Sequence, residues 1–426
     1  MNHYYYECFS CKSKFSKQQI ENDLHYLCPK CGKAEKNKPL VGVLKIIYNY
    51  NSVSEEIKKS DFLNLTPGEF WLYPQLWPLE YSLNNHSVSI KGITEQQLNS
   101  IKTISSPLIK TKYHGNDLLV FDDTRNPTLS FKDRASGLVA LKAIQLRVKE
   151  ISAASTGNAG SSLAGICARL GIKSHIFVPE KIPLGKRIQI QSFGANLYLV
   201  KGDYDQAFDL CLEISQAKGW YNRNTAYNPL TIEGKKSAAY DMFISLNGSL
   251  PDFIFVPVGD GVIISGIYKG LWELKQLGWI NEFPKLIAVQ ASGSNALVRY
   301  IKQKKFVYKT THTIADSIHA GAPRNLFMAA DAVTKTNGFA VSVTDFEIVD
   351  AQKKSAGEFG LLIEPAAAAS FAGYLKLLKT EIVSPKSRSL LMFTGNGLKD
   401  QQSLATWNDE PKSYSQDEWK RILKVK

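Results

Sequence analysis

The residue best suited to covalent chemistry is Lys132, in a segment (126–134) that reads NPTLSFKDR. The lysine follows Phe131 and stands where a helix is expected to begin. Desolvation against an aromatic ring and the positive end of a helix both lower the pKa of a lysine, which keeps its amine nucleophilic. The pattern therefore favours a Schiff-base role for Lys132. A surface lysine without a function is the alternative for this segment taken alone.

Three glycine-containing loops each follow an apolar run that is typical of a strand. They are Ser155–Gly160, Val258–Ser265 and Thr394–Gly397. Hydroxyls and free backbone N–H groups at the start of a helix suit a carboxylate or a phosphate. The second loop has the pattern of a phosphate-binding turn, although it contains Asp260. One such loop is a weak signal because glycine turns are common, but three in one chain indicate a ligand site.

Strands and helices are expected to alternate around these loops. Six short apolar runs predict strands, at 150–155, 175–178, 197–200, 253–256, 286–289 and 390–393, and helices are expected at 163–170, 184–193 and 204–218. This order predicts an α/β protein with parallel sheets and helices on both faces. Ligands collect beyond the carboxyl ends of such strands. We therefore expect two doubly wound parallel-sheet domains with a ligand between them.

From about residue 105 to 400 the chain resembles the threonine synthase group of the fold type II family of pyridoxal-phosphate enzymes. The SFKDR run at 130–134 carries the resemblance first. The other matching segments keep the order and spacing of the family, and they are 155–158, 185–189, 193–195, 228–236, 364–366 and 394–400. The resemblance implies a lyase of amino-acid biosynthesis that uses pyridoxal 5'-phosphate.

The resemblance also implies roles for single residues. Lys132 would bind the cofactor as a Schiff base and move protons. Phe131 would lie against the cofactor ring, Asn158 would hydrogen-bond the ring hydroxyl, and Thr394 would meet the pyridine nitrogen. Ser155 and Thr156 would hold the substrate carboxylate. The cofactor phosphate would lie on the backbone of Gly259, Asp260, Gly261, Val262 and Ile263.

The implied reaction converts O-phospho-L-homoserine and water to L-threonine and phosphate. One departure concerns the substrate phosphate, because Thr231 stands where the family usually has an arginine. A charge-assisted contact of that kind is worth about 1.5–3 kcal/mol. Arg324, proposed here as a substrate ligand, or Lys186 could supply the missing charge. The alternative is a threonine or serine ammonia-lyase, or a β-replacement synthase for another amino acid. An inactive relative that serves as an interaction protein is disfavoured by the intact Lys132 and Asn158.

Four cysteines near the N-terminus have the spacing of a metal site. They form the pairs Cys8-x2-Cys11 and Cys28-x2-Cys31. Such pairs hold Zn²⁺ in four-cysteine ribbons, and the absence of a spare ligand predicts a closed, structural site. Free or redox-active thiols are the alternative.

Composition excludes several classes of protein. The chain has 426 residues, of which 44% are hydrophobic and 21% charged, as is usual for folded proteins. Its net charge of +13 is scattered along the sequence, so we expect anionic small molecules rather than nucleic acid as ligands. No membrane span or secretory signal is apparent, which predicts a cytoplasmic location. The family resemblance suggests a homodimer.

The chain is expected to have four parts. A zinc-ribbon-like module covers residues 1–38 and an N-terminal extension covers 39–105. The catalytic core covers 106–410, with a smaller α/β subdomain inserted at about 140–220. A tail helix is expected at 411–426.

Overall fold

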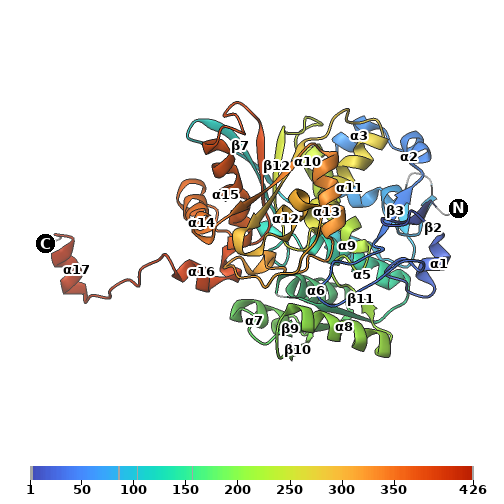
Figure 1. Cartoon of the computed structure of the whole chain (residues 1–426), viewed down its shortest axis with the longest axis horizontal. Helices are drawn as coiled ribbons and strands as arrows, with labels where there is room; N and C mark the ends of the chain where they lie inside the picture. Colours follow the sequence, from blue (N-terminus) through green and yellow to red (C-terminus); the bar gives the residue numbers. More distant parts are fainter. Residues whose placement is uncertain (1–2, 85–86, 103, 156, 425–426) are drawn as a thin grey trace.

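The computed structural model describes residues 3–84, 87–102, 104–155 and 157–424, and its centre is a six-stranded sheet (Figure 1). The strand order is β14-β13-β12-β15-β7-β6, and only β6 runs antiparallel to its neighbour. The strands are β6 (Leu108–Tyr113), β7 (Asn116–Asp122), β12 (Phe253–Pro257), β13 (Lys285–Ala291), β14 (Phe339–Val343) and β15 (Ser389–Phe393). The three strands predicted here from apolar runs are confirmed.

Helices cover both faces of this sheet, so its strands are apolar on both sides. Phe255 and Val289 pack under α15 (Pro365–Lys379) with α14 (Asp345–Phe359). The alternate residues Ile254 and Ala288 pack on the opposite face. The helices on that side include α10 (Ser237–Ser245), α11 (Val262–Gln276), α12 (Ala296–Gln303) and α13 (Leu326–Lys335).

A second sheet of four parallel strands lies beside the first (Figure 1). Its order is β10-β9-β8-β11, and the strands are β8 (Glu150–Ala154), β9 (Lys173–Pro179), β10 (Asn196–Val200) and β11 (Tyr221–Asn222). Its helices are α6 (Asn158–Leu170), α7 (Leu184–Ser192) and α8 (Tyr204–Lys218). Each of these strands and helices except β11 was expected from the sequence. The expectation of two parallel α/β units is therefore confirmed. Between the two sheets lie α5 (Asp133–Gln145) and α9 (Leu230–Lys235).

The N-terminal region forms a three-stranded antiparallel sheet, β2-β1-β3. Its strands are β1 (Tyr4–Cys8), β2 (Lys14–Phe15) and β3 (Leu44–Tyr48), followed in sequence by α2 (Tyr50–Glu56) and α3 (Lys59–Leu63). β1 pairs with β3 along its whole length, so this sheet joins the predicted module 1–38 to the predicted extension 39–105. A capping box at Ser16 starts the short helix α1 (Lys17–Glu21).

The rest of the extension packs on the core. Trp71 and Trp77 stack with ring centroids 4.3 Å apart, and Trp77 meets the ring of Tyr240 on α10. Both tryptophans are fully buried, which makes this segment part of the hydrophobic core. Its other elements are the hairpin β4 (Tyr81–Asn84) and β5 (Ser87–Ile90), the helix α4 (Glu95–Lys102), and the 3-10 turns Glu69–Leu72 and Pro74–Leu76.

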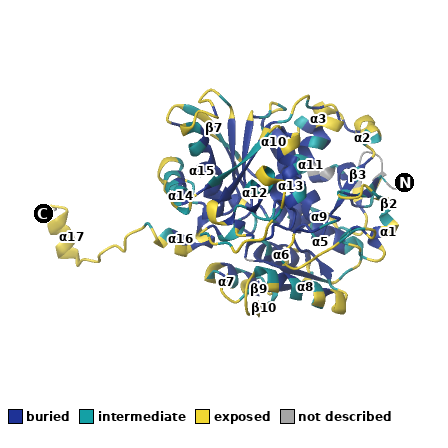
Figure 2. Cartoon of the chain, in the orientation of Figure 1, coloured by how far each residue is buried: buried dark blue, intermediate teal, exposed yellow. Residues whose placement is uncertain are grey.

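The C-terminus leaves the body of the protein. After α16 (Gln401–Ala405) the chain is extended and ends in α17 (Gln416–Ile422), which stands apart (Figure 1). All residues of α17 are exposed (Figure 2). Among the described residues, no helix combines the length and apolar character that crossing a bilayer requires.

Candidate active site

Lys132 lies directly before α5, at the carboxyl end of the large sheet. The turn that presents it is fixed by the Asp133 carboxylate, which accepts a 2.7 Å hydrogen bond from the backbone N–H of Thr128. The turn is also bonded to the loop after β15. Phe131 N–H donates to the carbonyl of Thr394 (3.0 Å), and an isolated bridge joins Ser130 to Gly395. The structure thus brings together two segments that are far apart in the sequence.

Lys132 is half-buried, and its amino group faces charges of both signs. Burial lowers its pKa from 10.5 to about 8, the Glu364 carboxylate opposes this shift, and the Arg223 guanidinium adds to it. An amine with this pKa is partly unprotonated near neutral pH. The environment therefore suits a nucleophile and a proton carrier.

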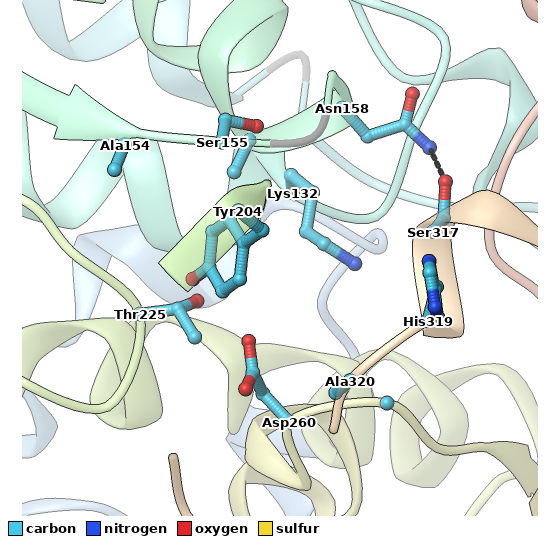
Figure 3. Close-up of a pocket in the computed structure, with 12 residues that line it drawn as sticks. Lys132, Ala154, Ser155, Asn158, Tyr204, Thr225, Asp260, Ser317, His319 and Ala320 are labelled. Atoms are coloured by element: carbon cyan, nitrogen blue, oxygen red, sulfur yellow. Dashed lines mark hydrogen bonds between the residues drawn. The ribbon is translucent and has the colours of Figure 1, made fainter. Parts of the chain in front are cut away.

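A cavity in front of Lys132 contains several of the predicted residues together with unpredicted ones (Figure 3). Asn158 lies on one side, and its Nδ2 donates to the Oγ of Ser317 (3.0 Å) and to both carboxylate oxygens of Glu364 (2.9 and 2.8 Å). Its Oδ1 is buried and has no hydrogen-bond partner among the described residues. The lining residues are Lys132, Ala154, Ser155, Asn158, Ala159, Tyr204, Thr225, Gly259, Asp260, Ser317, His319 and Ala320.

Ser155 shapes the loop that begins α6. Its Oγ accepts hydrogen bonds of 2.9 Å from the backbone N–H groups of Gly157 and Gly160. Gly157 has φ +147°, a conformation that favours glycine, and an added Cβ would meet the Lys186 side chain at 2.1 Å. The predicted substrate ligand Thr156 lies outside the described residues.

A second cavity continues from Lys132 to the start of α11. It is lined by the loop from Gly259 to Ile264 and by Thr225 and Lys235. A Cβ at Gly259 would come within 2.8 Å of Ile318 Cα, and one at Gly261 (φ +84°) within 2.6 Å of Ala329 Cβ. The glycines therefore permit a close backbone turn whose N–H groups precede a 15-residue helix.

Asp260 lies in this loop without blocking its backbone. Its carboxylate accepts a 2.9 Å hydrogen bond from the backbone N–H of Arg324, and its carbonyl accepts one of 2.9 Å from Asn325. Burial raises the pKa of this carboxyl group, and the Arg324 contacts oppose the shift. The carboxylate is thus bonded to a neighbouring loop.

The two cations expected to replace the missing arginine are both paired. The Arg324 guanidinium bonds to Asp205 and donates to the Lys38 carbonyl at 3.3 Å. The Leu40 N–H in turn donates to the Arg324 carbonyl at 3.1 Å. Arg324 is not among the described residues that line the two cavities. Its side chain points instead to α8 and the N-terminal region. Lys186 forms a 2.8 Å ion pair with Asp316.

Phe131 and Thr394 are both buried. Neither is among the described residues that line the two cavities. The ring of Phe131 lies 5.6 Å from the Arg134 guanidinium. The parts that the resemblance assigns to these two residues stay predictions.

Several lining residues carry no direct signal in the sequence. Tyr204 is the first residue of α8, Thr225 follows β11, and Ser317 lies in the 3-10 turn Asp316–Ile318. The rule that ligands lie beyond strand ends points to the region of Thr225. No motif marks Ser317 or His319, because only the tertiary fold brings them to the cavity.

The four N-terminal cysteines form a compact cluster. Their sulfur atoms all lie within 4.8 Å of one another, with Cys8 Sγ 3.5 Å from Cys31 Sγ and Cys11 Sγ 3.6 Å from Cys28 Sγ. None is in a disulfide. Four thiol groups at this spacing can surround one tetrahedral metal ion.

Comparison with known proteins agrees with this geometry. Residues 99–395 match the family described as pyridoxal-phosphate dependent enzyme. The chain is 35% identical over 410 residues to a threonine synthase of Methanocaldococcus jannaschii. The aligned region covers 93% of this chain and 98% of that protein. The chain is 32% identical over 417 residues to a threonine synthase of Methanosarcina acetivorans, covering 96% and 95%.

Solved structures share the fold at lower identity. Maize serine racemase superposes with a TM-score of 0.63 at 18% identity and covers 78% of this chain and 98% of its own. A fungal L-serine ammonia-lyase from Rhizomucor miehei superposes with a TM-score of 0.62 at 21% identity and covers 71% and 98%.

Proposed function

Since the chain belongs to the family of pyridoxal-phosphate dependent enzymes, we propose that it is a threonine synthase. This lyase converts O-phospho-L-homoserine and water to L-threonine and phosphate. The similarity to two threonine synthases over nearly the whole chain carries the proposal. The Lys132 amino group, at the junction of the two cavities, supports it.

The residues around Lys132 fit pyridoxal phosphate. The free Oδ1 of Asn158 is buried and unbonded among the described residues, as an acceptor for the ring hydroxyl would be. The loop Gly259–Ile263 supplies backbone N–H groups where a Cβ would not fit at Gly259 or Gly261. Thr394 is the proposed partner of the pyridine nitrogen, and Phe131 the proposed support of the ring.

Pyridoxal phosphate, when bound, draws electrons from the α-carbon of an amino-acid substrate. The protein must then accept and return protons at carbon. Lys132 Nζ suits this task because its pKa of about 8 allows both protonation states near neutral pH. Glu364 holds Asn158 in place through two hydrogen bonds. Tyr204 and Thr225 extend hydroxyls into the same cavity (Figure 3), where they can hold a water or a substrate oxygen.

The substrate carboxylate is assigned to the start of α6. Ser155 holds this turn by accepting from the N–H groups of Gly157 and Gly160, and Thr156, the next residue in the sequence, is the second proposed ligand. Backbone N–H groups at a helix N-terminus favour an anion. A carboxylate bound there would place the substrate in the cavity that Lys132 also lines.

A structural Zn²⁺ is proposed for Cys8, Cys11, Cys28 and Cys31. Their sulfur positions support this assignment. The purified protein should contain one equivalent of zinc, which elemental analysis tests. A homodimer and a cytoplasmic location stay predictions, and sedimentation analysis of the holoenzyme tests the first.

The test of the function is simultaneous measurement of phosphate and threonine. Purified protein loaded with pyridoxal phosphate receives O-phospho-L-homoserine, and both products should appear at equal rates. Lys132→Ala is the matched control and should form neither. If the loaded protein released ammonia from threonine or serine and formed no threonine from the phosphorylated substrate, the proposal would be wrong and the ammonia-lyase alternative would replace it.

A further inference from the structure

Lys235 on α9 is a buried lysine without a carboxylate partner among the described residues. It is 1% exposed, and its amino group donates to the carbonyl of Thr231 at 3.2 Å. No carboxylate among the described residues lies within ion-pair distance of it. Two other buried lysines differ in this respect, since Lys236 pairs with Glu233 at 2.7 Å and Lys142 with Glu21 at 2.8 Å. A buried ammonium without a counter-charge is costly, so Lys235 is expected to carry its charge only when an anion lies beside it.

The position of Lys235 defines where such an anion would lie. The residue lines the cavity formed by Gly259–Ile264 at the start of α11. Gly266 lets α9 and α11 approach closely there, because a Cβ at that position would come within 2.5 Å of Lys235 Cβ. Lys235 and the residues that begin α11 thus line the same cavity.

The remaining charges around this space are mostly positive. Burial, together with Arg223 and Lys132, lowers the pKa of Lys235 well below its usual value, and only Asp260 opposes this shift. The Asp260 carboxylate already accepts from Arg324 N–H. A dianion between α9 and α11 would therefore meet a cationic environment.

We propose that Lys235 is a direct ligand of a phosphoryl group held between α9 and the first turn of α11. The proposal rests on the proposed function, which brings two phosphoryl groups to this region, one on the cofactor and one on the substrate. Lys235 supplies a charge that neither Arg324 nor Lys186 is free to give, since both are paired with aspartates. It stands one helical turn after Thr231 and reaches back to the carbonyl of that residue.

The first experiment compares cofactor binding by the cofactor-free full-length protein and its Lys235→Met variant. Fluorescence titration with pyridoxal phosphate and with pyridoxal, which lacks the phosphate, separates the phosphoryl contact from the ring contacts. If Lys235 binds the cofactor phosphate, Lys235→Met should lose about 10- to 100-fold in affinity for pyridoxal phosphate, which corresponds to one charge-assisted hydrogen bond. Its affinity for pyridoxal should not change. Lys235→Arg should restore most of the affinity, and Lys142→Met, a remote buried lysine change, should leave it intact.

The second experiment identifies the source of the phosphoryl group. If Lys235 holds the substrate's group, pyridoxal phosphate binds the variant normally, while binding of inorganic phosphate to the loaded protein, followed by cofactor fluorescence, weakens at least 10-fold, on the same basis. Unchanged affinity for both ligands would overturn the proposal. Neither titration depends on threonine formation, so failure of the proposed function is seen separately, in the product assay.

The melting temperature of the cofactor-free Lys235→Met variant shows whether Lys235 serves only the packing of the fold. Replacing a buried lysine that has no carboxylate partner by an apolar side chain should leave the melting temperature of Lys235→Met unchanged or raise it. A lower melting temperature combined with unchanged phosphate affinities would mark Lys235 as a packing residue and overturn the proposal.

Discussion

The burial of Lys132 predicts how the rate of cofactor attachment depends on pH. Only the unprotonated amine attacks the aldehyde of pyridoxal phosphate. With a pKa of about 8 rather than 10.5, about a quarter of the Lys132 amines are unprotonated at pH ~7.5, against about one in a thousand for an ordinary lysine. Burial thus makes the reactive form roughly 200-fold more abundant at that pH.

The sign of the dependence follows from the same shift. The attachment rate should rise with pH and level off above about 8, which is the pKa of Lys132 in the folded protein. The Glu364 carboxylate raises this pKa, so Glu364→Gln should move the midpoint to lower pH. A substitution that removed a purely structural carboxylate would leave the midpoint in place.

The assay is stopped-flow absorbance of the protein-bound cofactor, from cofactor-free protein mixed with pyridoxal phosphate between pH 6 and 10. The control is the reaction of pyridoxal phosphate with Nα-acetyl-lysine in solution. The ionisations of the cofactor are the same in both reactions, but the ε-amine of the control has an ordinary pKa. The reasoning is refuted if the protein profile parallels the control and keeps rising above pH 9. A midpoint that rises in Glu364→Gln would contradict the assigned electrostatics.

Three further predictions concern the metal, the cofactor loop and the buried charges. Cys8→Ser should remove the bound zinc and lower the melting temperature while kcat per folded molecule stays near the wild-type value; elemental analysis and calorimetry check this, and a lost chemical step in folded protein would contradict it. Gly261→Ala should weaken pyridoxal phosphate binding measured by dialysis, because φ is +84° and the new Cβ has no room, a strain of about 1–2 kcal/mol. Glu273→Gln should destabilise the protein to urea by about 3–5 kcal/mol, since Lys236 and Lys269 both pair with this carboxylate; a loss below about 1 kcal/mol would show that the pairs contribute little.

Much of the core could be predicted from local patterns. Val256, Ala288 and their neighbours lie in strands buried on both faces, and such strands read as continuous apolar runs between glycine turns. The boundaries found for β8, β10 and α8 differ from the predicted ones by at most a residue. The cluster of the four cysteines also agrees with the spacing of the two pairs.

The site was predicted less completely because its side chains come from segments that only the fold brings together. Lys235 and Tyr204 line the cavities from different helices, and the sequence assigned a role in the site to neither side chain. Arg324 was expected at the substrate, but Asp205 on α8 binds its guanidinium. An ion pair of this kind depends on two elements meeting in space, which local sequence does not report.

The bonds that join Arg324 to Lys38, Leu40 and Asp260 have a consequence for the order in which the protein matures. Lys38 is synthesised 286 residues before Arg324, and elongation proceeds at about 5–20 residues per second. The N-terminal sheet can therefore form early, but its connection to the loop that contains Asp260 must wait for the last quarter of the chain. A nascent chain that stops short of residue 324 lacks the hydrogen bond that holds the Asp260 carboxylate, whatever the state of its cysteines.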